Sequence, residues 1–321
     1  MRFLVSCAVA AVLATSPVLA ADRLLIDDTG REITVPDTPE RIVVMHEPLL
    51  GVPLMDLDLD LAGSYGRADD GGFVIAVDFI DTVLGEGKAK PKGFGPVGQP
   101  DLEKLRALEP DLILASELDA GKVDQLSTVA PVYLQNISGD KVHGFDIQED
   151  LAVLLGREDL FEARKAGYMD RVAELRATLP GNAAGQTYLP VFLTDQINVV
   201  GDSSGMVQAL EDLGYTRLEV AEASTTSASG GSMMLMPLSA EVFGGLNPDI
   251  LVLLNSYMDS SRDETGTREK LDRIVPGWDR FMKPALEKRI LFVDPAKVIT
   301  PTVASAEHML DAVEHWGGQE R

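Results

Sequence analysis

One stretch of the chain has the residue types and spacing of a hydrolase nucleophile. Residues 201–205 (GDSSG) fit G-x-S-x-G and lie between an expected strand and an expected helix, as a nucleophile elbow requires. Asp249 or Asp294, followed by His308, would complete a triad in hydrolase order. Against this, His308 falls inside an expected helix, and no HGGG-like oxyanion motif precedes the serine. A serine hydrolase that uses Ser203 therefore stays open as an alternative.

Two other patterns are weaker. Residues 93–98 (GFGPVG) fit the dinucleotide fingerprint, but the run before them is rich in Lys and Pro and is not a strand. Pro96 also lacks the amide that a pyrophosphate cradle would use. His308, Asp311 and His315 share one face of a helix and could hold a divalent ion, although an exposed amphipathic helix is the ordinary explanation. We assign no catalytic residue, no metal ligand and no cofactor from these patterns.

Composition restricts the compartment and the partners. Residues 1–20 carry Arg2, an apolar run and a small-x-small cleavage site, which predicts a cleavable secretory signal peptide. Cys7 is the only cysteine, so the mature chain has no disulfide and no thiolate metal site. The apolar run before Cys7 is too short for a lipoprotein signal, so we expect no lipid anchor. Removing Arg2 with the signal changes the formal charge from −23 to −24, which argues against nucleic acid or anionic lipid as a partner.

The elements that must position any site alternate between strands and helices on both sides of residue 150. Such alternation predicts parallel strands with helices on both faces of each sheet. After a hairpin over 24–35, the first half is expected to have strands at 41–45, 61–64, 111–115 and 131–134 and helices at 48–57, 101–108 and 122–129. The second half is expected to have strands at 188–194, 197–200, 217–221, 249–254 and 290–293 and helices at 204–213, 240–246, 276–287 and 303–316.

A long helix is expected between these halves, over Arg157–Leu179. Phe161, Tyr168, Val172, Leu175 and Leu179 recur at the spacing of one apolar stripe. At 1.5 Å per residue the helix would be about 34 Å long, which is the span of a small domain. We interpret it as a strut between two lobes.

A degenerate repeat supports two lobes. Residues 103–114 and 241–252 both open with a glutamate, carry apolar residues at +2 and +5, and launch an apolar strand with Pro-Asp at +7. The fold class expected is therefore α/β, with two similar lobes of parallel-type sheets flanked by helices and bridged by one long rigid helix. Ligands of such sheets bind where loops leave the carboxyl ends of the strands. The predicted division is a signal peptide at 1–20, lobes at 21–142 and 186–321, and a connecting segment at 143–185.

Together these stretches resemble the periplasmic substrate-binding proteins of ABC importers for iron–siderophore complexes, a group that also serves cobalamin and haem. The resemblance covers essentially all of the mature chain. It is carried by residues 27–44 (DDTGREITVPDTPERIVV), 97–114 (VGQPDLEKLRALEPDLIL), 126–132 (LSTVAPV), 151–159 (LAVLLGRED), 238–254 (LSAEVFGGLNPDILVLL) and 277–294 (GWDRFMKPALEKRILFVD).

The resemblance implies a monomeric periplasmic receptor, not an enzyme, that carries a ferric siderophore to an ABC permease dimer in the inner membrane. Glu103 and Glu241 match the position of the family's surface glutamates, one on each lobe, that meet arginines of the permease. The bridging helix implies that the lobes close by a small rocking motion. Haem or cobalamin is the alternative ligand within this class, and the secreted serine hydrolase using Ser203 is the alternative outside it.

Candidate ligand contacts are polar or aromatic residues that follow predicted strands. Arg67 could pair with an anionic chelate, Tyr65 and Tyr257 could stack on chelator rings or ligate Fe(III), and His46 could complete a metal's coordination. The family's ligand contacts vary between members, so the resemblance transfers little at these positions. Residues 224–232, rich in Ser, Thr and Gly, are expected to form a mobile loop. The candidates are His46, Tyr65, Arg67, Gln99, Glu117, Thr194, Asn255 and Tyr257.

Overall fold

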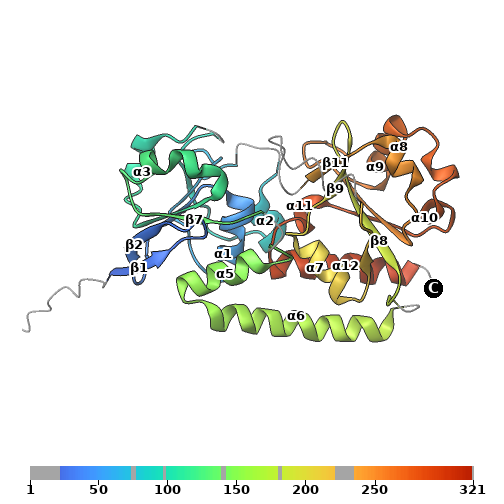
Figure 1. Cartoon of the computed structure of the whole chain (residues 1–321), viewed down its shortest axis with the longest axis horizontal. Helices are drawn as coiled ribbons and strands as arrows, with labels where there is room; N and C mark the ends of the chain where they lie inside the picture. Colours follow the sequence, from blue (N-terminus) through green and yellow to red (C-terminus); the bar gives the residue numbers. More distant parts are fainter. Residues whose placement is uncertain are drawn as a thin grey trace, which may run out of the picture.

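Two α/β lobes lie side by side above one long helix in the computed structural model of the chain (Figure 1). The structure describes residues 22–73, 77–96, 99–138, 142–179, 183–220 and 235–319. The expected signal peptide and the expected mobile loop at 224–232 lie outside these residues. Among the described residues, no helix combines the length and the apolar composition needed to cross a bilayer.

The first lobe is built on a five-stranded parallel sheet with strand order β5-β4-β3-β6-β7. A separate antiparallel hairpin, β1–β2, precedes it as the sequence predicted. Its elements are β1 (Asp22–Ile26), β2 (Glu32–Pro36), β3 (Ile42–Val44), η1 (Glu47–Gly51), α1 (Val52–Asp56), β4 (Gly63–Ser64), α2 (Phe79–Leu84), β5 (Lys92–Gly93), α3 (Leu102–Ala107), β6 (Leu112–Ser116), η2 (Glu117–Lys122), α4 (Val123–Leu126) and β7 (Val132–Gln135).

The second lobe has a mixed sheet with strand order β11-β9-β8-β12-β13, and β10 pairs with β8. Strand β9 runs antiparallel to both neighbours. Its direction relative to β8 follows from the short turn between them, which leaves no room for a crossover. Its elements are β8 (Thr187–Leu193), β9 (Ile197–Val200), α7 (Gly205–Asp212), β10 (Thr216–Arg217), β11 (Leu235–Leu238), α8 (Ala240–Gly245), β12 (Ile250–Asn255), α9 (Glu264–Ile274), η4 (Trp278–Arg280), α10 (Lys283–Leu286), β13 (Ile290–Val293), α11 (Pro295–Val298) and α12 (Val303–Gln319).

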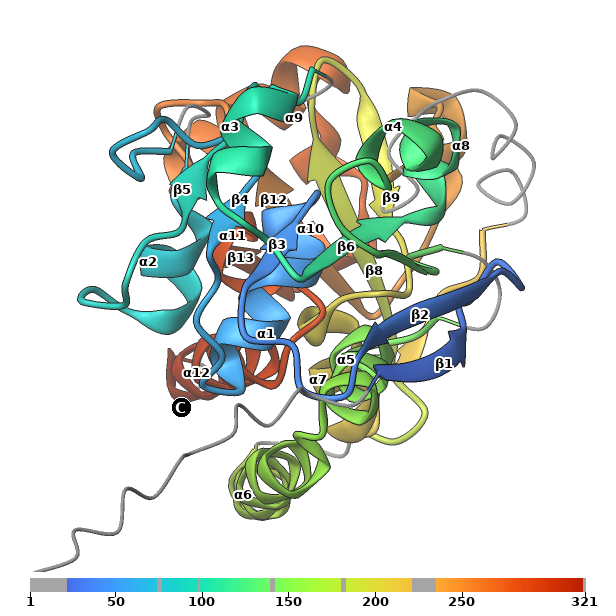
Figure 2. The ribbon, with the colours of Figure 1, turned by 90° about the vertical axis from the view of Figure 1, so that its left-hand side faces the viewer.

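Helices α5 (Asp146–Leu155) and α6 (Glu158–Thr178) connect the lobes. Helix α6 begins and ends within one residue of the prediction. Its buried residues are Phe161, Tyr168, Val172 and Leu175, which confirms four of the five predicted stripe positions; the fifth, Leu179, is partly buried at the C-cap of the helix. Figures 1 and 2 show α6 along one side of the molecule, outside both sheets.

The two sheets share one hydrophobic core. Alternate strand residues point to opposite faces, so Val43 and Val191 pack into the outer cores of their own lobes. Their neighbours Val44 and Phe192 instead belong to one continuous core that also contains residues of α2, α5, α6 and α12. The inner faces of the lobes are therefore joined by apolar contact and not only by the connecting helices.

The fold class is confirmed, but some elements differ from the prediction. The helix expected over 276–287 is wrong: only the short segments η4 and α10 form there, and a residue with left-handed backbone, Gly277, precedes them. Helices α2 and α9 were not predicted from the sequence. The division at 142/143 and 185/186 stays a prediction.

Candidate ligand-binding site

Topology gathers the first-lobe candidates at one sheet edge. Strands β3, β4, β6 and β7 are parallel, so their carboxyl ends meet at the same edge. His46, Tyr65, Arg67 and Glu117 all follow the ends of these strands by three residues or fewer. The four residues thus lie near one edge of the first-lobe sheet. Their surroundings decide which of them can touch a ligand.

His46 is partly exposed and caps η1. Its Nδ1 accepts a hydrogen bond from the Leu49 N–H at 3.2 Å. Burial lowers the pKa of His46 to about 4, although the charge of Asp119 acts in the opposite direction. The imidazole is therefore neutral near pH 7, with its proton on Nε2, and it can donate one hydrogen bond to a ligand. Metal binding through Nδ1 would break the cap.

Tyr65 belongs to the packing of the first lobe. It is 6% exposed and its ring stacks on Phe94 at 5.8 Å between centroids. Burial raises the pKa of its phenol, as does the charge of Asp119. A buried phenol held in the protonated form is a poor iron ligand. A direct ligand role for Tyr65 therefore has no support in its surroundings.

Arg67 and Glu117 are engaged with neighbouring protein groups. The Arg67 side chain has no exposed surface and pairs with Glu47 and Asp78. Glu117 accepts from the Ile137 N–H at 2.9 Å and from the Ser138 hydroxyl, so it ties the loops after β6 and β7 together. Contact between Arg67 and a ligand would require its ion pairs to open.

Gln99 and Thr194 lie in turns. Gln99 is exposed just before α3, and its N–H donates to the Pro96 carbonyl at 3.0 Å. Thr194 is partly exposed in the β8–β9 turn, where its Oγ1 accepts from Asn198 Nδ2 at 3.0 Å. Both side chains reach the surface, and both remain candidates.

Asn255 and Tyr257 follow β12 in the second lobe but have different roles. Asn255 is 2% exposed and donates from Nδ2 to the Ser261 carbonyl at 2.6 Å, which holds the loop that follows. Tyr257 is partly exposed and packs edge-on against Phe79 of the first lobe and Phe192 of the second, both at 5.7 Å. Asn255 therefore shapes the loop, and Tyr257 lies where the lobes meet.

Sequence reasoning missed Arg262, which lies on the same loop. Its Nε is 3.5 Å from Asp294 Oδ1, its Nη1 donates to the Tyr257 carbonyl at 3.4 Å, and its side chain is 30% exposed. It was missed because only the first residues after each strand were considered. Met258, 63% exposed on this loop, was also missed. The signal that could have identified them is the presence of an exposed apolar residue and a cation within a polar loop.

The paired glutamates are exposed in matching places. Glu103 lies in the first turn of α3, after the N-cap Asp101, and Glu241 lies in the first turn of α8, after the N-cap Ser239. Helices α3 and α8 belong to different lobes, and both lie on the side of the molecule opposite α6 (Figures 1 and 2). The arrangement presents one carboxylate from each lobe on the same side.

Among the described residues, those of the enzyme-like and metal-like patterns do not come together in a catalytic or metal-binding arrangement. Ser203 Oγ is buried and has no hydrogen-bond partner among the described residues. His308, the histidine expected for a triad, bonds through Nε2 to the Val83 carbonyl at 2.9 Å, and Asp311 pairs with Arg171. In the described parts of the chain, no group of three or more His, Cys, Asp or Glu residues could hold a metal ion.

Glycine in the 93–98 pattern has a packing role. A Cβ on Gly93 would lie 1.7 Å from the Arg67 carbonyl oxygen, so the backbone of β5 and the loop at 67–68 approach too closely for any side chain. The Gly93 N–H donates to the Ala68 carbonyl at 3.0 Å. Residues 97 and 98 lie outside the described residues.

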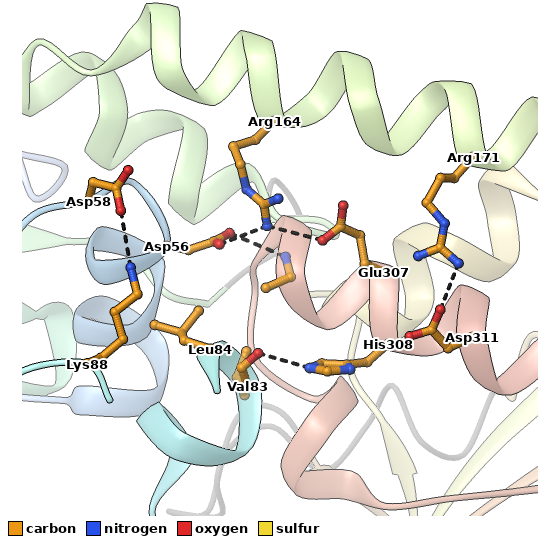
Figure 3. A pocket seen from close by; sticks show the side chains of 11 residues that line it. Asp56, Asp58, Val83, Leu84, Lys88, Arg164, Arg171, Glu307, His308 and Asp311 are labelled. Carbon is orange, nitrogen blue, oxygen red and sulfur yellow. Dashed lines mark hydrogen bonds and ion pairs between the residues drawn. The ribbon is translucent and has the colours of Figure 1, made fainter. Parts of the chain in front are cut away.

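A polar junction joins the lobes next to α6, around a cavity of about 420 Å³ (Figure 3). Arg164 of α6 donates to Asp56 of the first lobe at 2.8 Å and to Glu307 of the second at 3.2 Å. Asp56 also accepts from Gln148 Nε2 at 2.9 Å and from the Ala304 N–H at 3.3 Å. Asp56 of the first lobe thus caps the first turn of α12 in the second.

Comparison with known proteins agrees with this architecture. A family model described as periplasmic binding protein matches residues 73–297. The chain belongs to the periplasmic binding protein family. It is 27% identical to the putative ABC transporter substrate-binding lipoprotein YhfQ of Bacillus subtilis, over 72% of this chain and 70% of that protein. It is also 27% identical to the ferric-anguibactin-binding protein FatB of Vibrio anguillarum, over 72% of this chain and 68% of that protein.

Solved structures share the fold. The crystal structure of holo-ViuP matches with a TM-score of 0.68 and 16% identity, covering 91% of this chain and 93% of that one. The Bacillus subtilis triscatecholate siderophore binding protein FeuA, complexed with ferri-bacillibactin, matches with a TM-score of 0.65 and 19% identity, covering 92% and 98%. At these identities the match establishes the fold of two lobes and a bridging helix.

Proposed function

We propose that this protein captures a ferric siderophore complex between its lobes in the periplasm and delivers it to an ABC permease dimer. Family membership and the ferric-chelate ligands named for its relatives support the proposal. The observation that carries it is the position of Tyr257, which follows a second-lobe strand yet rests on Phe79 of the first lobe. Loops at the strand ends of the second lobe therefore meet the first lobe, where a ligand can contact both.

The protein acts as a carrier and performs no chemistry on its ligand. It needs no cofactor and works as a monomer, exported by the signal at 1–20 without a lipid anchor. The absence of a partner for Ser203 Oγ among the described residues supports this over hydrolysis.

The ligand contacts that we propose are the partly exposed side chains at the strand ends. His46 offers a neutral Nε2–H donor, and Arg262 offers a cation in place of the buried Arg67. Burial raises the pKa of Tyr257, which disfavours the phenolate that would ligate Fe(III). Tyr257 is therefore assigned to ring contact with the ligand, and the chelator itself is expected to supply the iron ligands.

The test is a fluorescence titration with ferric citrate, ferric desferrioxamine, a ferric tris-catecholate, haemin and cobalamin. Trp278 and Trp316 lie in the second lobe and report quenching by an iron chelate. We expect one ferric chelate to bind with a Kd on the order of 1 μM or below, about −8 kcal/mol, and its iron-free form to bind far more weakly. Binding of haemin or cobalamin alone would change the ligand class, and no binding by any probe would reject the proposal.

Arg262→Gln gives the residue-level test. Loss of a charge-assisted hydrogen bond costs about 1.5–3 kcal/mol, so affinity for an anionic chelate should fall about tenfold or more. Arg273→Gln, on α9 of the same lobe, is the control and should bind like the wild type. Equal binding by both variants would remove Arg262 from the site.

A further inference from the structure

All five N–H donors of Arg67 are used within the first lobe. Nε and Nη2 donate to Glu47 at 2.5 and 2.6 Å, Nη1 and Nη2 donate to Asp78 at 3.0 and 2.9 Å, and Nη1 also donates to the Gly71 carbonyl at 2.6 Å. The side chains of Arg67 and Glu47 have no exposed surface. Since a guanidinium has five donors, none is left for a ligand.

The charged groups of this network stabilise one another in their ionised forms. Burial alone would lower the pKa of Arg67, but the bonds to Glu47 and Asp78 raise it above its usual range. Burial likewise opposes ionisation of Asp78, but Arg67 lowers the pKa of that carboxyl. A planar guanidinium that bonds two carboxylates also fixes their orientation, which a lysine ammonium cannot reproduce. The network is therefore suited to setting a geometry.

The geometry that it sets is the start of α2. Asp78 is the N-cap of this helix, and its carboxylate accepts from the N–H groups of Ile80 and Asp81 at 3.1 and 3.3 Å. The next residue is Phe79. The guanidinium of Arg67 also lies 5.1 Å from the ring centroid of Phe73. Arg67 thus holds α2 at its first turn.

Phe79 in turn belongs to a run of ring contacts that crosses the lobes. Phe73 meets Phe79 edge-on at 6.4 Å, Phe79 meets Tyr257 at 5.7 Å, and Tyr257 meets Phe192 at 5.7 Å. Phe192 is 1% exposed in β8 of the second lobe. Rings in such edge-on contacts hold a preferred relative orientation. We call Phe73, Phe79, Tyr257 and Phe192 the interlobe aromatic row.

We propose that Arg67 is a positioning residue for ligand binding: through Asp78 it fixes Phe79, and so fixes where Tyr257 stands at the meeting of the lobes. This inference rests on the proposed function, because Tyr257 is a proposed ligand contact. A buried ion pair often contributes little net stability, so the role that we assign to this network is the orientation that it imposes. Affinity then depends on a residue that never touches the ligand.

The first test is a double-mutant cycle on affinity, with the ferric chelate that binds best among ferric citrate, ferric desferrioxamine and a ferric tris-catecholate. Arg67→Lys and Tyr257→Ala should each weaken binding about tenfold. The double variant should bind no more weakly than Tyr257→Ala alone, because Arg67 acts through Tyr257. Effects that multiply in the double variant would overturn the inference, since independent sites add in free energy.

Loss of stability must be separated from loss of position. Leu105→Ala removes a fully buried side chain from the outer core of the first lobe, so it should lower Tm without changing Kd. Asp78→Asn keeps a good N-cap residue but weakens the pairing with Arg67, and it replaces Arg67→Lys if that variant does not fold. It should weaken binding severalfold, and an unchanged Kd would contradict the inference.

A second readout needs no ligand. With 3-fluorotyrosine incorporated, the ¹⁹F signal of Tyr257 is assigned from its absence in Tyr257→Phe. Asp78→Asn should shift that signal while leaving the signal of Tyr133, on β7, in place. If no chelate binds but the signal shifts, the proposed function fails and the positioning stands. If chelates bind and neither Kd nor the signal responds, the positioning fails alone.

Discussion

Asp111 in the first lobe and Asp249 in the second are structurally equivalent. Asp111 accepts a hydrogen bond at 2.9 Å from the N–H of Arg41, just before β3, and Asp249 accepts one at 2.8 Å from the N–H of Thr187, the first residue of β8. In each lobe the strand that begins at or just after the donating N–H pairs directly with the strand that follows the aspartate. The aspartate of the Pro-Asp step therefore makes the same contact with the start of a neighbouring strand in both lobes, and the lobes share one construction.

The same equivalence leads to a prediction for Glu103 and Glu241. Each is exposed in the first turn of a helix that precedes the repeat's strand, so each lobe offers one carboxylate to a partner. Glu103→Ala together with Glu241→Ala should leave chelate affinity within about twofold and abolish uptake of the ⁵⁵Fe-labelled chelate in cells. Each single variant should retain part of the uptake.

The matched control for that experiment is Glu162→Ala with Glu174→Ala. Both residues are exposed on α6, on the opposite side of the molecule. This pair removes the same charge and should transport like the wild type. Normal uptake by the Glu103/Glu241 double variant would withdraw the docking assignment.

Asp56→Ala should destabilise the junction of the lobes. Its carboxylate, 6% exposed, accepts from Arg164, Gln148 and the first turn of α12. Loss of bonds to a charged group should lower the free energy of unfolding by about 2–3 kcal/mol, measured by urea denaturation at pH 7. Asp58→Asn, two residues away, removes the charge of a 76% exposed carboxylate paired with Lys88, keeps a residue type that tolerates the left-handed backbone at this position, and should cost less than about 0.5 kcal/mol. Equal losses would contradict the role of Asp56.

Stability should also depend on pH through His143. Its Nε2 lies 2.9 Å from Glu211 Oε2, and this bond raises the pKa of His143, with smaller contributions from the charges of Glu211, Asp202 and Asp146. Because the pKa of His143 is higher in the folded state than in the unfolded state, its protonation stabilises the fold. This contribution is fully present below the unfolded pKa, near 6.5, and is lost as pH rises through the folded pKa.

His143→Gln should therefore cost more stability at pH 5.5 than at pH 8.5. Because the His143 side chain is 40% exposed, solvent screening limits the difference to less than about 1 kcal/mol. Denaturant titrations at the two pH values measure it, and Glu211→Gln should flatten the same dependence. A constant difference between wild type and His143→Gln would refute this linkage.

Ser203→Ala tests the hydrolase alternative. Since Ser203 Oγ is buried with no partner among the described residues, removal of the hydroxyl should leave stability unchanged or slightly raised. Neither protein should hydrolyse p-nitrophenyl esters. Wild-type turnover that Ser203→Ala abolishes would restore the alternative.

Local patterns predicted the framework well. The apolar stripe of α6 and the short apolar strands are signals that can be recognised from neighbouring residues alone. The sequence repeat predicted the two lobes. Helix α2 was not predicted because its signal is short. It consists of Asp78 as N-cap and six helical residues inside a glycine-rich stretch. The reversed β9 follows from loop length and not from strand composition.

Side-chain roles in the site were harder to predict. Arg67 and Arg262 both follow strands, yet one is enclosed by Glu47 and Asp78 and the other is 30% exposed. The partners of Arg67 lie 20 and 11 residues away in sequence, so nothing local distinguishes the two arginines. Only tertiary contact does.

The continuous core between the lobes has a consequence for how the chain melts. Val44, Phe192 and residues of α6 and α12 all contribute to one apolar cluster, so opening either lobe would expose the inner face of the other. Calorimetry should record a single cooperative transition, with van't Hoff and calorimetric enthalpies in agreement. We therefore expect two lobes that look separate in outline to unfold as one cooperative unit.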